Sequence, residues 1–64
     1  MITLHHENGE ITRIVENGNG TITTSGWYGG AVGVTSRYSV SDVEEHIQES
    51  AHIHSNRVVE ITRS

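Results

Sequence analysis

The chain has 64 residues, of which 33% are hydrophobic, and it contains no cysteine and no proline. Its 8 acidic residues outnumber 4 basic ones, all arginine, for a formal net charge of −4 at pH 7 with neutral histidines. This composition excludes disulfides and thiolate-held zinc, and it opposes binding to nucleic acid, where affinity depends on many basic contacts to phosphates. No apolar run is long enough for a signal peptide or a membrane span. We therefore expect one small cytoplasmic domain over residues 1–64, with no cofactor and no membrane contact.

The hydrophobic residues are few and mostly β-branched. Ile and Val predominate, Leu4 is the only leucine, and phenylalanine is absent. Branched side chains favour pleated sheet over helix. A core of this size rarely supplies more than about 3–5 kcal/mol of stability without a staple. We therefore expect the chain to bury additional apolar surface as a homodimer, by strand pairing or by packing of sheet faces.

The pair Asn8-Gly9 predicts the first hairpin, because both residues accept the positive φ that a tight turn needs. A two-residue turn here pairs Glu7 with Glu10 and fixes the register of the two strands. Side chains alternate between faces along a strand, so this register gathers a set of apolar residues on one face. They are Ile2, Leu4, Ile11 and Val15.

Residues 17–20, which read Asn-Gly-Asn-Gly, predict a second hairpin. With a loop of two or four residues, Glu16 pairs with Thr21 and Ile22 joins the same apolar face. A slip of one residue would scatter these side chains over both faces. Turn chemistry and hydrophobic pattern thus agree on an antiparallel meander of three strands. Its outer face would carry Thr3, His5, Thr12, Ile14 and Thr23.

Two further strands and a helix complete the predicted fold. Branched residues predict strands over residues 31–38 and 57–62. Between them, Ser41 and Glu44 have the spacing of a capping box, which predicts a helix over residues 42–52. The alternative start is Ser39, with Tyr38 packing on Val43 as a hydrophobic staple. The apolar stripe of this helix consists of Val43, Ile47 and Ala51. The order β-β-β-β-α-β predicts an α+β fold in which one helix packs on one face of a small antiparallel sheet.

The loop after the third strand carries two of the three aromatic residues, Trp27 and Tyr28. Large amphipathic side chains on a glycine-rich loop are typical of protein-binding hot spots, so both are candidate partner-binding residues. Trp27 has an alternative role, that of capping a core without phenylalanine. Tyr28 lies outside the predicted apolar face, so its truncation is expected to leave the fold intact.

Three carboxylates share one face of the predicted helix. Asp42, Glu45 and Glu49 could imitate phosphate spacing and occupy a basic nucleic-acid-binding groove of another protein. These residues join the aromatic loop as candidate partner-binding residues. The alternative is a solvated helix face without a partner.

The five histidines suggest a metal site. In an extended segment, His52 and His54 would project from one side, a spacing that suits zinc, nickel or copper. His46 or Glu49 would have to supply a third ligand. Alternatively, His52 and His54 are exposed residues at a helix end, where a cationic imidazole suits the helix dipole.

These features favour an interaction module over an enzyme. No Ser/His/Asp or Cys/His constellation is evident, and the chain leaves little room for a buried site. We expect a non-enzymatic acidic module that binds a larger protein partner. Phage inhibitors of the anti-CRISPR and anti-restriction type are similar in size and charge, without a shared motif. The alternatives are the histidine metal site and nucleic-acid binding by the sheet, against which the net charge argues; the latter would use Arg13, Arg37, Arg57 and Arg63.

Overall fold

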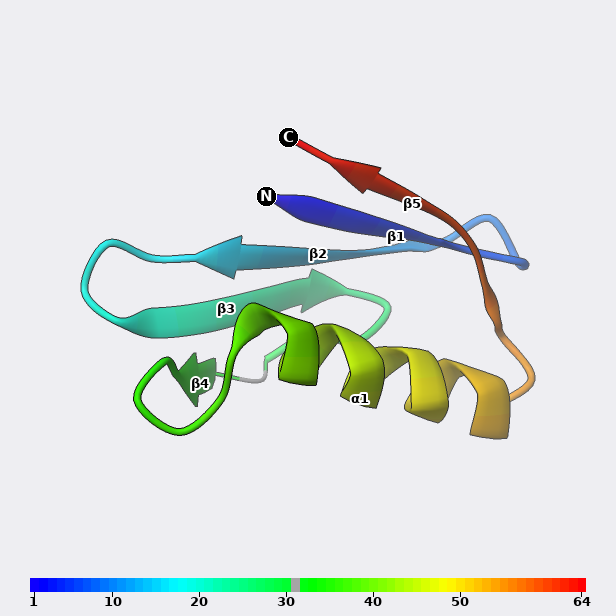
Figure 1. Cartoon of the computed structure of the whole chain (residues 1–64). Coiled ribbons are helices and arrows are strands. Elements are labelled where there is room, and N and C mark those ends of the chain that lie inside the picture. Colours follow the sequence, from blue (N-terminus) through cyan, green and yellow to red (C-terminus); the bar gives the residue numbers. More distant parts are fainter. Residues whose placement is uncertain (31) are drawn as a thin grey trace.

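The computed structural model describes residues 1–30 and 33–64 and the backbone of Val32. Within this part of the chain, five strands form one antiparallel sheet in the order β4-β3-β2-β1-β5, and one helix precedes the last strand (Figure 1). The elements are β1 (Ile2–His6), β2 (Ile11–Glu16), β3 (Thr21–Gly26), β4 (Val32–Val34), α1 (Val40–Ile53) and β5 (Val58–Arg63). The predicted α+β class and element order are confirmed.

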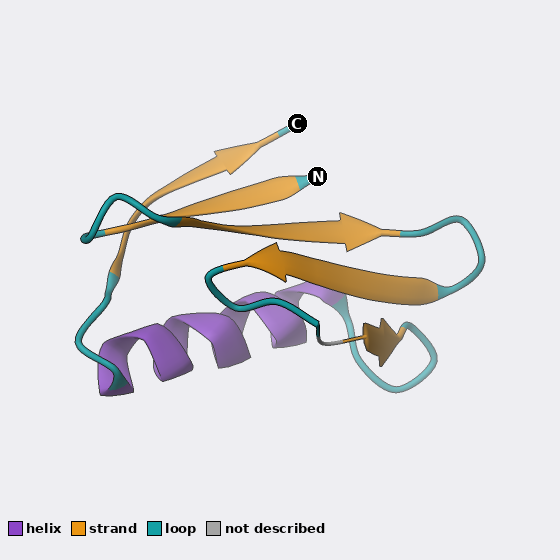
Figure 2. Cartoon of the chain, turned by 180° about the vertical axis from the view of Figure 1, so that it is seen from behind, coloured by secondary structure: helices purple, strands orange, loops and turns teal. Residues whose placement is uncertain are grey.

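The molecule has two layers, because α1 lies across one face of the sheet (Figure 2). The predicted stripe is confirmed: Ile47 and Ala51 are fully buried, and Val43 packs against the core. Among the residues whose side chains the structure describes, the buried hydrophobic ones are Leu4, Ile14, Ile22, Ile47 and Ala51. The other sheet face carries no second layer in the described part of the chain. No helix described here has the length and apolar character that a membrane crossing requires.

The predicted register of the first hairpin is wrong by one residue. Leu4 pairs with Thr12, and His5 pairs with Ile11. The His6 amide donates to the Glu10 carbonyl at 2.9 Å, and the Gly9 amide donates to the His6 carbonyl at 3.0 Å. These bonds close a loop of three residues, 7–9, instead of the expected two. Gly9 has φ +91°. This is a type I turn followed by a left-handed glycine, which suits Asn-Gly as well as the two-residue turn does.

The second hairpin has the same geometry, and its predicted register is also wrong by one residue. Asn17 donates to the Thr21 carbonyl at 2.8 Å, and Gly20 adopts φ +82°. Glu16 therefore pairs with Ile22 rather than with Thr21. Ile22 still reaches the core, as expected.

The shifted register exchanges the two faces of β2. Thr12 and Ile14, expected on the outer face, are buried under α1, whereas Val15 is exposed. Ile11 also leaves the core face, since it pairs with outward-facing His5. The branched residues of β2 lie on both faces, so their pattern alone could not select the register. The register is instead favoured by polar contacts that only the inner face can make.

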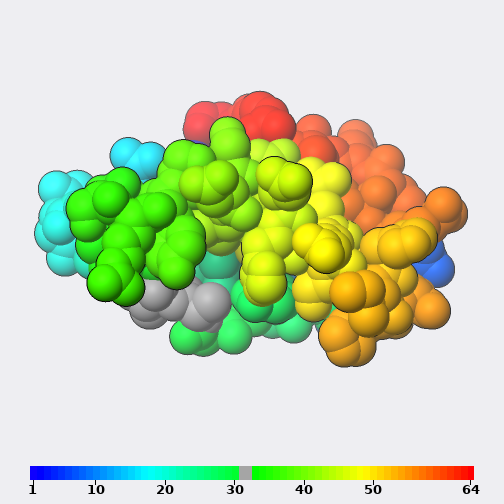
Figure 3. Space-filling model, turned by 60° about the horizontal axis from the view of Figure 1, so that its bottom comes forward, coloured from blue at the N-terminus to red at the C-terminus, as the bar shows by residue number. Residues whose placement is uncertain are grey.

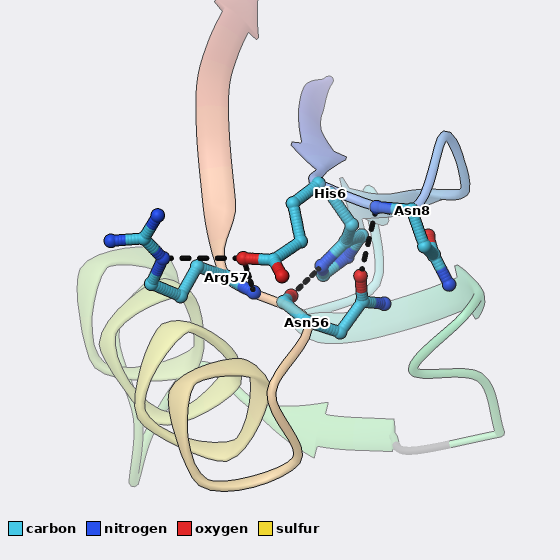
Figure 4. Close-up of polar contacts among 5 residues, drawn as sticks. His6, Asn8, Asn56 and Arg57 are labelled. Atoms are coloured by element: carbon cyan, nitrogen blue, oxygen red, sulfur yellow. Dashed lines mark hydrogen bonds and ion pairs between the residues drawn. The ribbon is translucent and has the colours of Figure 1, made fainter.

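Those contacts centre on His6, which is also buried (Figure 4). Its Nδ1 lies 2.9 Å from the Asn56 carbonyl oxygen, and its Nε2 lies 2.6 Å from Thr12 Oγ1. A carbonyl oxygen only accepts, so Nδ1 carries the hydrogen, and in a neutral ring Nε2 accepts from the Thr12 hydroxyl. Asn56 Oδ1 in turn accepts from the amide of Asn8 in the first turn, at 3.2 Å. Buried polar groups paired in this way are tolerated in a core.

Strand β4 is shorter than the expected strand over residues 31–38, of which position 31 lies outside the described residues. The chain turns after Val34, whose carbonyl accepts from the amides of Arg37 and Tyr38 at 2.9 and 3.0 Å. Gly33 faces α1, and a Cβ there would lie 3.7 Å from side-chain atoms of Ile22 and Val43. The strand is therefore brief, but it lets the helix approach the sheet closely.

The helix begins two residues before the predicted start, with Ser39 as its cap in place of Ser41. Ser39 Oγ accepts from the Asp42 amide at 3.1 Å, and Asp42 Oδ2 accepts from the Ser39 amide at 2.9 Å. The pattern of serine followed three residues later by an acid occurs twice in succession, so sequence spacing allows both caps. The earlier cap brings Val40 against the core. It also leaves Glu44 free to pair with Arg63, with 2.7 Å between Glu44 Oε1 and Arg63 Nη2.

Strand β5 is shifted by one residue from the predicted range and pairs with β1. The two chain ends therefore lie side by side (Figure 1). The Met1 ammonium donates to the Ser64 carbonyl at 2.9 Å, and the Ser64 amide donates to the Met1 carbonyl at 3.0 Å. An irregularity in the pairing between His5 and His6 leaves Val59 as the extra residue of β5.

The capping geometry predicts unequal effects of two similar substitutions. Ser39→Ala removes the acceptor for an otherwise unpaired helix amide and should lower the free energy of unfolding by about 1 kcal/mol in urea denaturation. Ser41→Ala is the matched control, because Ser41 is an exposed residue inside the first turn; its effect should stay within about 0.5 kcal/mol. A larger loss at Ser41 than at Ser39 would contradict the observed cap.

Candidate protein-binding surface

The aromatic loop leaves β3 through a glycine that no other residue could replace without strain. Gly26 has φ +92°, and an added Cβ would collide with the carbonyl oxygen of Ile11. That same oxygen accepts from the Trp27 amide at 2.9 Å. The Gly30 amide closes the loop by donating to the Thr24 carbonyl at 3.2 Å. The loop is therefore held against the end of the sheet by backbone contacts.

Trp27 is half-buried and covers the His6 network. Its ring centroid lies 4.7 Å from that of His6 and 6.1 Å from that of His54 at the end of α1. The indole thus bridges the first hairpin and the helix end. This position agrees with the capping role considered for Trp27, and it leaves only part of the ring accessible to a partner.

Tyr28 is tied into the fold more firmly than its sequence position predicts. Its ring packs against the hydrophobic core, and its amide donates to Thr12 Oγ1 at 3.3 Å. Its hydroxyl lies 3.0 Å from His46 Nε2, and the two rings meet edge to face at 5.8 Å between centroids. The expectation that Tyr28 lies outside the apolar core is wrong. Truncating it would disturb the core as well as any bound partner.

The predicted acidic face of α1 is present. Asp42, Glu45 and Glu49 are all exposed. In helical geometry they project away from buried Ile47, on the side opposite the sheet. The remaining helix carboxylate, Glu44, is buried and forms a bidentate pair with Arg63.

The contact between Tyr28 and His46 brings the two predicted groups together. His46 lies on α1 between the positions of Asp42 and Glu49, so the aromatic loop runs along the flank of the acidic face. Figure 3 shows the surface of the segment before residue 30 directly beside the middle of α1. We call this combined area the helix–loop surface. Its exposed or half-exposed residues are Tyr28, Asp42, Glu45, His46, Glu49 and Ile53.

Ile53 is the member that sequence reasoning missed. It is 69% exposed and follows Glu49 by four residues, so it lies on the same side of the helix. The predicted helix ended at residue 52, which assigned Ile53 to an extended segment between two histidines. The sequence did hold one signal of this exposure, because Ile53 does not fall on the apolar stripe of Val43, Ile47 and Ala51. An exposed isoleucine among carboxylates gives this surface an apolar contact point.

One of the three carboxylates also has a structural role. Hydrogen bonds from the backbone amide and the hydroxyl group of Ser39 lower the pKa of Asp42 below its ordinary value of 3.8. The negative charge of Asp42 is therefore stabilised by the cap. Neutralising Asp42 would affect the helix start and binding together, whereas Glu45 and Glu49 are exposed residues in the body of the helix.

The histidines do not adopt the arrangement that a metal site would need. His52 belongs to the last turn of α1 and His54 caps it, so the expected extended segment is wrong. His54 Nδ1 is occupied by the Ser50 carbonyl at 2.8 Å. No three His, Cys, Asp or Glu side chains in the described ranges are grouped as metal ligands.

Two of the four arginines are already paired within the fold. Arg57 Nε lies 3.2 Å from Glu7, and Arg63 pairs with Glu44. Their charges are thereby compensated inside the protein. This pairing weakens the alternative of a basic sheet face for nucleic acid, since phosphate binding depends on many uncompensated cations.

Comparison with known proteins gives no functional assignment. No family model, curated protein or solved structure matches the chain. The geometry of the helix–loop surface therefore carries the functional argument.

The lowered pKa of Asp42 predicts a pH-dependent contribution to stability. A carboxyl group with a folded-state pKa below its unfolded value stabilises the fold above the unfolded pKa and loses this contribution as pH falls through the folded value. Thermal unfolding of the wild type and of Asp42→Asn, compared from about pH 6 down to about pH 2.5, tests this. The wild type should lose stability relative to the variant below about pH 4. A difference that stays constant over this range would contradict the account.

Proposed function

We propose that this chain is a protein-interaction module that binds a basic partner protein through the helix–loop surface. The observation that carries the proposal is the contact between Tyr28 and His46, 3.0 Å from hydroxyl to ring nitrogen. It fixes an aromatic loop beside an exposed acidic helix face, so that residues from separate parts of the chain form one continuous surface.

The surface combines the two components that protein recognition uses. Carboxylates at Glu45 and Glu49 act at long range and accelerate encounter with a positively charged partner. Ile53 and the accessible part of Tyr28 provide apolar and aromatic area that a partner can bury at short range. Because Tyr28 packs against the core and bonds His46, its ring is already ordered and loses little conformational freedom on binding.

The charge pattern indicates which partners to seek. Carboxylates at Asp42, Glu45 and Glu49 form an acidic row along α1, and such a row can occupy a groove that otherwise binds phosphates. A nucleic-acid-binding protein is therefore the partner class that we propose, with inhibition by occupation of its binding groove as the mode of action. The size and net charge of the chain, which resemble those of phage inhibitors, support the same proposal.

A charge-matched pair of variants tests the proposal. Glu45→Gln with Glu49→Gln removes two charges from the helix–loop surface, and Glu10→Gln with Glu16→Gln removes two charges from exposed positions of the first two hairpins. Capture from an extract of the host cell, quantified for wild type and both variants, should reveal a protein that the first variant retains about tenfold less well and the second retains normally. The loss should arise mainly from slower association and should shrink as salt rises.

Two results would contradict the proposal. A partner that is lost equally with both variants responds to net charge and not to this surface. A partner that binds both variants like the wild type uses another part of the molecule.

A further inference from the structure

Strand β5 forms an open edge of the sheet. It pairs with β1 on one side, and no described strand lies on the other. The opposite edge, β4, has 3 residues, whereas β5 has 6. A long exposed edge presents unpaired backbone donors and acceptors to another chain. Of the two edges, β5 is therefore the one able to template a further strand.

The backbone pattern identifies which groups of β5 point outward. Met1 and Ser64 exchange two backbone hydrogen bonds, at 2.9 and 3.0 Å. In an antiparallel ladder such pairs alternate with pairs that exchange none. In the observed register, Thr62 and Glu60 therefore bond to β1, while Ile61 and Arg63 direct their amide and carbonyl groups to the free edge.

The side chains of β5 do little to protect this edge. The strand contains no lysine and no proline, the residues that most often block edge pairing. Val59 is 61% exposed and Ile61 is 36% exposed. A charged Arg63 side chain could discourage pairing at this edge, but its guanidinium is bound by the carboxylate of Glu44 on α1. Apolar surface and free backbone groups thus coincide on one edge.

We propose that β5 pairs antiparallel with β5 of a second copy of this chain, with Ile61 on the two-fold axis. The two sheets then continue into one, and both α1 helices lie on the same face. The proposal is independent of the proposed function, since β5 contributes no residue to the helix–loop surface. It also gives the thin core a way to bury more apolar surface.

Charge and backbone pattern together select this register. From Glu60 to Arg63, alternate residues of β5 direct their backbone groups to the free edge, so a register that sets an outward-facing residue opposite an inward-facing one leaves backbone groups unpaired. Centring on Glu60 would oppose two carboxylates, and centring on Arg63 would oppose two guanidinium groups. With Ile61 on the axis, two apolar side chains meet and residues 58–64 of each copy overlap. With Thr62 on the axis, the overlap is shorter.

Proline at the central position tests the proposal while sparing the fold. Ile61→Pro removes an outward amide that makes no bond to β1, and proline is accepted at such edge positions. Ile61→Val keeps the amide and is the matched control. By sedimentation equilibrium the wild type and Ile61→Val should be dimers, while Ile61→Pro should dissociate at least about tenfold more readily and keep its circular dichroism spectrum.

If the proline variant does not fold, a charge variant tests the same β5 pairing. Ile61→Lys opposes two ammonium groups on the axis and should weaken the dimer at least about tenfold, whereas Thr23→Lys, on the exposed outer face of β3, should leave it unchanged. A wild-type chain that stays monomeric up to about 1 mM, the weak end of specific association, would overturn the proposal. So would a dimer of unchanged strength in Ile61→Lys.

Discussion

The rest of the fold depends on the two hydrogen bonds made by the buried imidazole of His6. One ring nitrogen bonds the Asn56 carbonyl in the connection between α1 and β5, and the other bonds Thr12 on β2. Figure 4 shows how the first hairpin and this connection meet around the ring. A single side chain on β1 thus joins its neighbouring strand to a segment 50 residues away in sequence. Turning His6 outward by a one-residue slip would break both bonds.

The network extends from His6 in three directions, and each supports a different part of the structure. Thr12 accepts from the Tyr28 amide, which places the aromatic loop. Asn56 Oδ1 accepts from the Asn8 amide, which stabilises the first turn. Trp27 covers the imidazole from outside. Buried Asn56 Nδ2 has no hydrogen-bond partner among the described residues, a condition that costs about 1–3 kcal/mol. The network's remaining bonds and the packing around it must offset this cost.

The sequence was sufficient for the architecture because each element carries its own signal. Branched strands, two Asn-Gly turns and the stripe through Ile47 and Ala51 predict the element order and the packed helix face correctly. The register was not predictable from these signals, since Asn-Gly suits a three-residue loop as well as a two-residue one. Ile14 and Val15 are adjacent, so a hydrophobic pattern fits either face of β2. The deciding contact joins His6 to Asn56, and local sequence patterns carry no information about so distant a pair.

The candidate site was also predictable only in part: the acidic helix face follows from the sequence, and the position of the aromatic loop does not. Asp42, Glu45 and Glu49 share an exposed face because helical spacing alone determines it. The role of Tyr28 was not evident, because its contact with the core follows from the Thr12 register and from the position of His46. The cap at Ser39 likewise required tertiary packing of Val40 to distinguish it from Ser41. The helix–loop surface thus combines a face that spacing predicts with a loop position that only the folded polar network determines.

Direct observation of the His6 ring by nitrogen–proton NMR is the most direct test of this central role. A hydrogen on Nδ1 that exchanges slowly with solvent and shows through-bond coupling to the Asn56 carbonyl carbon is the predicted result, because the ring is buried and that oxygen can only accept. A ring without a hydrogen on Nδ1, or one whose Nδ1 hydrogen exchanges freely and lacks this coupling, would contradict the account.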